Sequence, residues 1–400
     1  MTPRPRRPSR NPRARQPRGR SRVGERFEVV AGPIAHGGHV VARVPTGGIH
    51  EPTGEPETRV VFVRHALPGE RVLVEITEGT DGDRFWRGDA VEVREASPDR
   101  VPPPCPYAGP GRCGGCDFQH VAPAAQRELK AAVLREQLTR LARLEAGDPL
   151  LETVVEEVPG DPGAPDGLRW RTRQSYARTP DGSRAMRLHR SHDVIPVEDC
   201  LIARTDAREP APGTVTETAL GRDFTVAADG FWQVHPGAPG ALVDAVLTML
   251  DPRPGESALD LYAGVGLFSA FLAERVGPDG RVVAVEGDRR ASDLSRRNVP
   301  AAEVVAGDVG QVLDGAVEGR VDLVVLDPPR EGARRSVVEQ VVARVPRAVA
   351  YVACDPAALA RDVAIFAEHG YRLEALRSFD VFPMTHHVEC VALLTPGDET

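Results

Sequence analysis

Short apolar runs alternate with longer amphipathic segments through the second half of the chain. The runs lie at 258–261, 282–285, 304–306, 323–326 and 349–353. Strands that are buried on both faces of a parallel sheet have this continuous apolar character, because helices cover both faces. The pattern predicts an α/β fold, with a doubly wound, Rossmann-like domain over residues 229–400.

The first quarter of the chain has a different pattern, with brief β-like segments separated by Gly and Pro. The expected strands are 27–30, 39–44, 59–63, 71–76 and 90–93. Five short strands in this length predict a small OB-like β-barrel over residues 24–95, which is a frequent scaffold for binding nucleic acid. The alternative is a barrel that only packs against its neighbour.

Residues 96–228 mix both patterns and predict a central α+β domain. Leucines at helical intervals predict a helix over 124–144. Residues 170–190 alternate like a hairpin that is rich in arginine and contains Trp170 and Tyr176. Basic strands with aromatic side chains could form an RNA surface, and a solvated charged hairpin is the alternative.

The distribution of charge sets the N-terminus apart. The 400-residue chain has a formal net charge of −8, but nine arginines and no acidic residue precede Glu25. We expect residues 1–23 to form a disordered tail, which either binds RNA phosphates or only solubilises the protein. No apolar run approaches the length of a membrane span and there is no secretory signal core, so we expect a cytoplasmic protein without a membrane partner.

Acidic residues follow four of the apolar runs at the edge where such sheets bind ligands. Asp260 precedes the turn that contains Gly264, and Glu286, Asp308 and Asp327 follow the later strands. Glycine lets the backbone approach a ligand closely. This acidic edge would repel a diphosphate but suits a cationic cofactor with a ribose diol, whose hydroxyls Glu286 could bind. The pattern therefore predicts S-adenosylmethionine.

A nicotinamide cofactor is the alternative reading of the same turn. Its fingerprint has a third glycine, where this chain has Ser269.

Three cysteines lie within twelve residues, and a fourth follows in the same predicted domain. They are Cys105, Cys113, Cys116 and Cys200. Four thiolates can hold either a [4Fe–4S] cluster or a structural zinc ion, and spacing alone does not distinguish the two.

A thiol and a carboxylate near the end of the chain are candidate catalytic groups. Cys354 follows the fifth apolar run, and Glu389 begins a last strand. C5 of a pyrimidine becomes nucleophilic when a thiolate adds to C6, and a base must then remove the C5 proton. We expect Cys354 to be the nucleophile and Glu389 the base, whereas Cys390 lies on the opposite face of its strand.

Taken together, several motifs resemble those of the RNA 5-methyluridine (uracil-C5) methyltransferases, in the iron–sulfur ribosomal-RNA type. They are Cys-Gly-Gly-Cys-x-x-Gln-His, Phe-x-Gln-Val, Asp-Leu-Tyr-x-Gly-x-Gly-x-Phe, Asp-Pro-Pro-Arg-x-Gly, Tyr-Val-x-Cys-x-Pro and Phe-Pro-x-Thr-x-His-x-Glu. The resemblance covers residues 24–396. It implies a TRAM barrel, a central iron–sulfur domain, a methyltransferase domain and 5-methyluridine formation in 23S rRNA, with tRNA as the alternative substrate.

The resemblance also implies roles for individual residues. Cys105, Cys113, Cys116 and Cys200 would ligate a [4Fe–4S] cluster. Gln233, Tyr262, Glu286, Asp308 and Asp327 would contact S-adenosylmethionine or the target base. Cys354 and Glu389 keep the roles given above, and RNA would be the partner of a monomeric enzyme. One departure is His235, which replaces the asparagine usual in the Phe-x-Gln-Val segment.

Two other classes share some of these features. Asp-Pro-Pro also occurs in enzymes that methylate amino groups of adenine or cytosine, but those enzymes need neither Cys354 nor Glu389. A non-enzymatic RNA-binding module would account for the barrel and the arginine tail but not for the acidic cofactor edge.

Overall fold

The computed structural model describes residues 19–49, 54, 56–161, 163–315, 317 and 319–397. Within them the chain divides into two compact units, one comprising the N-terminal residues to Pro98 except 36–38, and the other the remainder. Most of the predicted tail (residues 1–18) lies outside the described residues. Arg20 and Arg22, at its end, form ion pairs with Glu25, and Arg22 also pairs with Asp81, so residues 19–23 are ordered on the first unit.

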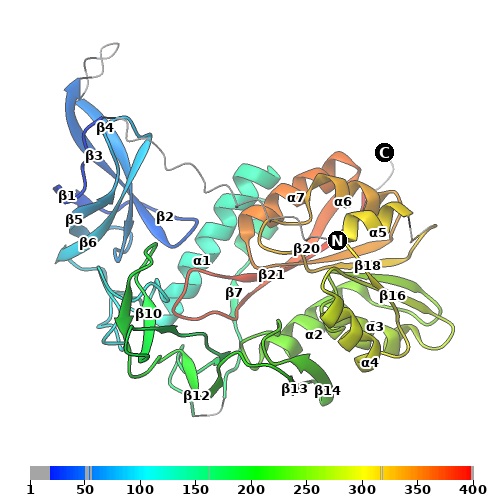
Figure 1. Cartoon of the computed structure of the whole chain (residues 1–400). Coiled ribbons are helices and arrows are strands. Elements are labelled where there is room, and N and C mark those ends of the chain that lie inside the picture. Colours follow the sequence, from blue (N-terminus) through cyan, green and yellow to red (C-terminus); the bar gives the residue numbers. More distant parts are fainter. Residues whose placement is uncertain are drawn as a thin grey trace, which may run out of the picture. The chain divides into compact units, whose positions relative to one another are not determined.

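The first unit is the predicted β-barrel, a single six-stranded sheet around an apolar core (Figure 1). Its strands are β1 (Arg26–Val30), β2 (Ile34–Ala35), β3 (His39–Ile49), β4 (Pro56–Arg64), β5 (Arg71–Glu78) and β6 (Phe85–Glu95), in the order β1-β5-β6-β4-β3-β2. Alternate residues such as Val61 and Val63 face the core, which is also filled by Trp86. The remaining residues of each strand therefore face outward.

The second unit is built on an eight-stranded sheet in the order β17-β16-β15-β18-β19-β21-β20-β7. Its strands are β7 (Val155–Glu157), β15 (Ser257–Leu261), β16 (Arg281–Glu286), β17 (Glu303–Ala306), β18 (Leu323–Leu326), β19 (Ala348–Ala353), β20 (Tyr371–Asp380) and β21 (Glu389–Pro396). The five strands from β17 to β19 are parallel, and β21 runs antiparallel between β19 and β20. The inserted antiparallel strand distinguishes this sheet from the six parallel strands of a dinucleotide-binding fold.

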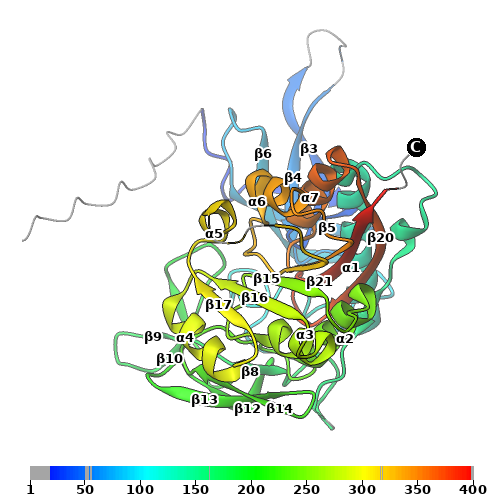
Figure 2. The same cartoon turned by 90° about the vertical axis from the view of Figure 1, so that its right-hand side faces the viewer.

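Helices cover both faces of this sheet, as the continuous apolar strands require (Figure 2). The helices are α1 (Pro123–Gln137), α2 (Ala238–Leu250), α3 (Leu267–Val276), α4 (Arg289–Asn298), α5 (Val309–Gly315), α6 (Arg334–Val342) and α7 (Pro356–Glu368). Helices α1, α5, α6 and α7 share one apolar core with the sheet, while α2, α3 and α4 share the other. No helix in the described residues is both long and apolar enough to cross a bilayer.

The central region contains short elements. A π-helical turn (Leu138–Ala142) extends α1, so the predicted helix over 124–144 is α-helical only to Gln137, and a 3-10 turn (Pro149–Glu152) follows. The strands are β8 (Arg171–Arg173), β9 (Ala177–Arg178), β10 (Arg184–Arg187), β11 (Val194–Pro196), β12 (Ala203–Arg208), β13 (Thr214–Ala219) and β14 (Arg222–Ala227). The predicted hairpin is β9–β10, while β8 pairs instead with β12.

Candidate active site

The turn between β15 and α3 leaves the backbone open on one side and tightly packed on the other. A Cβ on Gly266, where φ is +92°, would lie 2.8 Å from the side chains of Ser295 and Val299. A Cβ on Gly264 would meet no atom within 4 Å. Gly266 thus serves packing, whereas Gly264 presents accessible backbone to the carboxyl edge of the sheet, as the prediction requires.

Ser269 occupies the place of the third glycine because it supports a buried carboxylate. Its backbone N–H and its hydroxyl donate to Asp260 Oδ2 at 2.8 and 2.5 Å. Asp260 is fully buried, which raises its pKa to about 6 despite these hydrogen bonds. The serine therefore stabilises an acid at the cofactor edge, and its presence gives no support to a nicotinamide site.

The predicted acidic residues meet at this edge. Burial, followed by the negative charges of Asp260 and Glu286, raises the pKa of Asp327 to about 7. Glu286 accepts from Gly264 N at 2.8 Å and from Asp288 N at 2.6 Å, so its carboxylate is fixed beside the glycine turn. This cluster of carboxylates favours a ligand with a positive charge.

Tyr262 and Asp308 lie at the same edge. Burial raises the pKa of Tyr262 to about 12, and the charge of Asp308 adds to the shift. Asp308 also accepts from Gln311 N at 3.1 Å at the start of α5. Gln233 lies in the loop before α2, 8% exposed, and within the described part of the chain no hydrogen bond joins it to these acids.

The ends of β19 and β21 bring the predicted nucleophile and base together. Ala353 pairs with Cys390 in the antiparallel ladder, so the next position on each strand sets Cys354 opposite Glu389. Burial raises the pKa of Cys354 to about 12, and the charge of Glu389 contributes to the rise. Burial and the charge of Asp327 raise the pKa of Glu389 well above its usual range. Cys390 faces the opposite side of the strand and is fully buried.

Arg330 and His387 border this pair, and sequence reasoning gave them no role. The positive charge of Arg330 lowers the pKa values of both Cys354 and Glu389, against the larger effect of burial. Arg330 Nη2 lies 3.2 Å from His387 Nε2. Burial, with the neighbouring charges of His386 and Arg330, lowers the pKa of His387 to about 3, so a neutral imidazole can accept this bond. Their positions within two of the recognised motifs were the only signal in the sequence.

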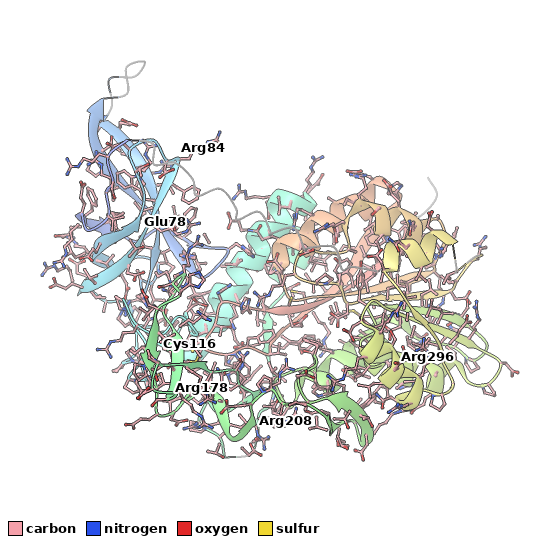
Figure 3. The ribbon with its side chains drawn as sticks, viewed as in Figure 1. Glu78, Arg84, Cys116, Arg178, Arg208 and Arg296 are labelled. Atoms are coloured by element: carbon pink, nitrogen blue, oxygen red, sulfur yellow. The ribbon has the colours of Figure 1, made fainter. Side chains whose placement is uncertain are left out.

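The four predicted cysteine ligands line one cavity of about 250 Å³. Cys116 lies beside the short strands of the central region (Figure 3). Backbone and side-chain N–H groups point at the sulfurs: Gly115 N donates to Cys113 Sγ at 3.4 Å and Gln119 Nε2 to Cys116 Sγ at 3.5 Å. Burial raises the pKa of Cys116, and the three other thiols add to the rise. Among the described residues, no three His, Cys, Asp or Glu side chains are arranged to hold a metal ion.

Several arginines of the segment 169–190 form ion pairs or hydrogen bonds within the protein. Arg178 and Arg184 both pair with Glu209, and Arg169 pairs with Asp199. Arg171 lines the cysteine cavity and donates to a backbone carbonyl. Arg178 and Arg184 remain about half exposed in these pairs, so the RNA surface and the solvated hairpin both stay predictions.

Comparison with known proteins agrees with this geometry. Residues 317–396 match the family model for tRNA (uracil-5-)-methyltransferases, and residues 20–91 match the TRAM domain. An RNA methyltransferase of Streptomyces avermitilis is 45% identical and covers 94% of this chain and 99% of its own. The 23S rRNA (uracil(1939)-C(5))-methyltransferase RlmD of a Shewanella species is 29% identical over 84% of this chain and 90% of its own.

A solved structure shares the fold. The tRNA (uracil-54, C5)-methyltransferase of Pyrococcus abyssi, in complex with S-adenosyl-L-homocysteine, aligns with a TM-score of 0.63 at 21% identity, over 88% of this chain and 99% of its own. The methyltransferase fold and the N-terminal TRAM domain predicted from the sequence are therefore confirmed. The chain belongs to the RNA uracil-C5 methyltransferase family and is an S-adenosylmethionine-dependent enzyme.

Proposed function

We propose that this enzyme forms 5-methyluridine in 23S rRNA, with Cys354 as nucleophile and Glu389 as base. The observation that supports this most directly is the register of β19 and β21, which sets a thiol and a carboxylate opposite each other at the cofactor edge. The near full-length similarity to a 23S rRNA enzyme favours ribosomal RNA. The tRNA enzyme from Pyrococcus abyssi supports the fold and leaves tRNA as the second candidate substrate.

In the proposed mechanism, the Cys354 thiol first loses its proton to solvent, and the thiolate then forms a C–S bond to C6 of the uracil. The electrons of the C5–C6 double bond move onto the O4 carbonyl, which makes C5 enolate-like and nucleophilic. S-adenosylmethionine, when bound, would supply the methyl group to C5, and the electron pair of its S–CH3 bond would stay on the sulfur of the leaving S-adenosylhomocysteine. The Cys354 sulfur is thus the group that activates the ring, and it remains bonded until the C5 proton is removed.

Glu389 accepts that proton, and the C–H electron pair restores the C5–C6 double bond as the C–S bond breaks. The raised pKa of Glu389 makes its ionised form a strong base. After burial, the negative charge of Glu389 is the largest cause that raises the pKa of Cys354, so the thiolate is favoured when the Glu389 carboxyl is neutral. This fits the sequence of events, because the thiolate is expelled only as the carboxylate becomes protonated.

The residues at the acidic edge fit S-adenosylmethionine. Glu286 would hold the ribose diol, and Asp308 and Tyr262 would flank the base of the cofactor. Asp327 would offset the positive sulfonium, and Gly264 would allow close approach of the backbone. Gln233 would contact the target base from the loop before α2.

The cysteine cavity fits a [4Fe–4S] cluster better than a zinc ion. Cys105, Cys113, Cys116 and Cys200 line a cavity of about 250 Å³, which leaves room for a cluster, whereas a single tetrahedral ion needs far less space. Cluster sulfurs and their thiolates accept N–H hydrogen bonds of the kind that Gly115 and Gln119 donate. Methyl transfer requires no redox step, so we assign the cluster a structural role.

Protein purified without oxygen should be brown and contain about four irons per chain. One zinc per chain would contradict the assignment.

The outward face of the barrel offers the surface for RNA. Phe62 and Phe85 lie edge to face with ring centroids 5.2 Å apart, and the guanidinium of Arg87 lies 5.0 Å from the centroid of Phe85. Arg43 is exposed on the neighbouring strand β3. Aromatic faces beside arginines bind single-stranded nucleic acid by stacking and by contact with phosphates.

As an enzyme that modifies RNA, the protein would act as a monomer in the cytoplasm.

Tritium release tests the proposed reaction. Ribosomal RNA and tRNA transcripts that carry 5-tritiated uridine would be incubated with the enzyme and S-adenosylmethionine. Uracil-C5 methylation releases tritium to water, whereas amino-group methylation or binding alone does not. We expect release from the 23S fragment; release from tRNA only would favour the second substrate, and no release from either would contradict the proposal.

A further inference from the structure

The segment that follows Cys116 binds the loop that precedes Glu389. The backbone N–H groups of Asp117 and Phe118 both donate to the carbonyl of Met384, each at 3.0 Å. His386 donates its backbone N–H to Asp117 Oδ2 at 3.2 Å, and its Nδ1 lies 2.6 Å from the same oxygen. These contacts join the cysteine site to the catalytic loop (residues 382–388), although the two segments lie far apart in the sequence.

Helix α1 holds the same loop from a second direction. The buried side chain of Gln126 accepts from Met384 N at 2.8 Å and donates to Val121 O at 2.9 Å. Lys130 donates to Asp380 at 2.6 Å and to Phe382 O at 3.1 Å. Met384 has a φ of +65°, which a residue with a side chain rarely adopts. Such a conformation persists only where the surroundings fix it.

Apolar packing makes the same connection. Met384, Trp170 and Ile202 form a buried cluster, and the residues packed against it include Cys116, Cys200, Val234 and Phe382. This cluster therefore contacts the cysteine site, the catalytic loop and the loop that carries Gln233. A disturbance at the cysteines would reach both loops, because tightly packed interiors transmit strain.

The catalytic loop also contacts the surroundings of Cys354 and Glu389. The His386 ring lies on His387 with centroids 4.1 Å apart, and His387 meets Arg330 as described above. His386, His387 and Val388 line the same small cavity as Cys354. The position of His386 thus determines where His387 and the positive charge of Arg330 lie beside Cys354 and Glu389.

From these contacts we infer that Asp117 is a positioning residue for methyl transfer, which couples the cysteine site to the catalytic loop by holding Met384 and His386. The inference rests on the proposed roles of Cys354 and Glu389. It means that the cysteine site and the reactive pair form one ordered unit, so that Asp117 acts on the rate of the chemical step without touching the RNA or the cofactor.

A double-mutant cycle tests this coupling. Asp117→Ala, His386→Ala and the double variant would be compared with Asp117→Asn, which keeps an oxygen acceptor for His386. As a control, Asp206→Asn alters an exposed carboxylate that pairs with Arg204. The kcat and KM for a 23S fragment, the Kd for S-adenosylmethionine and the rate at which iodoacetamide alkylates Cys354 would be measured with the cysteine site loaded.

We expect Asp117→Ala and His386→Ala each to lower kcat about tenfold, with the double variant no worse than either, because both break one interaction. Asp117→Asn should recover much of the loss. The KM and the cofactor Kd should stay within about twofold, while alkylation of Cys354 should accelerate severalfold as the loop loosens. Asp206→Asn should match the wild type in all respects.

Unchanged kcat and alkylation in either single variant, or fully additive losses in the double variant, would overturn the inference. If Asp117→Ala does not fold, His386→Ala and Asp117→Asn still decide the question, since each alters the contact between the Asp117 carboxylate and His386 from one side only. Alkylation requires no RNA, so it reports on the loop even if the wild type released no tritium, an outcome that would contradict the proposed function alone.

Discussion

At the scale of single residues, the reactive pair is governed by burial. The Cys354 thiol and the Glu389 carboxyl both resist ionisation, and Arg330 is the positive group that opposes this tendency. A bound sulfonium would add a second positive charge and would favour the ionised forms. We therefore expect the Cys354 thiol to be protonated in the free protein and to ionise more readily when the cofactor is bound.

Replacement of Cys354 by serine tests the nucleophile. We expect Cys354→Ser to lower methylation by more than about a thousandfold, because a hydroxyl adds poorly to C6, while cofactor binding stays unchanged. The matched control is Cys390→Ala, which removes the neighbouring thiol from the other face of the sheet and should keep most activity. Methyl incorporation into a 23S fragment and calorimetric cofactor titration are the measurements, and substantial activity in the serine variant would refute the assignment.

Removal of the carboxylate should stop the reaction later. Glu389→Gln retains Cys354 and should still form the C–S bond, but the C5 proton cannot leave, so a covalent protein–RNA adduct should accumulate. A denaturing gel with labelled RNA would reveal the adduct as a slowly migrating band. If the variant binds RNA normally but gives no such band, another group removes the proton.

Cofactor affinity should depend on pH through Asp327. Its pKa in the free protein is raised to about 7, and a bound cation would lower it. Protonation below pH 7 therefore opposes binding, and the Kd for S-adenosylmethionine should rise as the pH falls from 8 to 6. Asp327→Asn should bind more weakly at pH 8 and show a flatter profile in calorimetry. A wild-type Kd that is constant over this range would contradict the assignment of Asp327.

At the scale of elements, we expect two separate contributions of the barrel to RNA affinity, one from base stacking on Phe85 and one from the positive charge of Arg87. Phe85→Ala should weaken RNA binding at every salt concentration with an unchanged slope, since stacking releases no counterions. Arg87→Gln should instead reduce the slope of log K against log salt by about one. Fluorescence anisotropy with a single-stranded fragment would measure both, and equal slopes for all three proteins would show that Arg87 contacts no phosphate.

Some strands and contacts of the second unit are predictable from the sequence, and others are not. The strands β15, β16, β18 and β19 were predictable because they are largely buried on both faces, and an acid or Cys354 lies at or just after the end of each. The edge strand β17 is only partly buried, and its apolar residues were the signal for it. The pairing of Cys354 with Glu389 followed from chemistry and motifs. By contrast, β7 is three residues long and has no periodicity to detect, yet it completes the sheet beside β20. The bond between Asp117 and His386 joins residues 269 apart, and no local pattern encodes such a contact.

At the scale of the whole molecule, the barrel that we propose for RNA binding and the proposed reactive pair belong to different compact units. The barrel has its own core, and the acidic edge, the reactive pair and the cysteine cavity all belong to the second unit. The predicted domain bounds at residues 95 and 228 remain a prediction. However, β7 lies before the second bound and joins the methyltransferase sheet, so the central region and that sheet are structurally continuous.

Deletion of residues 1–98 should therefore abolish tight RNA binding and leave cofactor binding intact. The remaining chain keeps every side chain of the acidic edge, so we expect its Kd for S-adenosylmethionine to stay within about threefold, while RNA affinity falls by at least about tenfold. Calorimetry and anisotropy would measure the two constants. If RNA affinity and methylation survive the deletion, recognition lies in the second unit.

The placement of β21 between β19 and β20 has a consequence for synthesis on the ribosome. Strand β21 is synthesised after β19 and β20 and yet lies between them in the sheet, so a nascent chain that ends before Glu389 lacks both the proposed base and a partner for the edge of β19. An apolar unpaired edge invites association with other chains. We therefore expect chains that are interrupted before β21 to be inactive and to expose an apolar edge of the kind that chaperones bind.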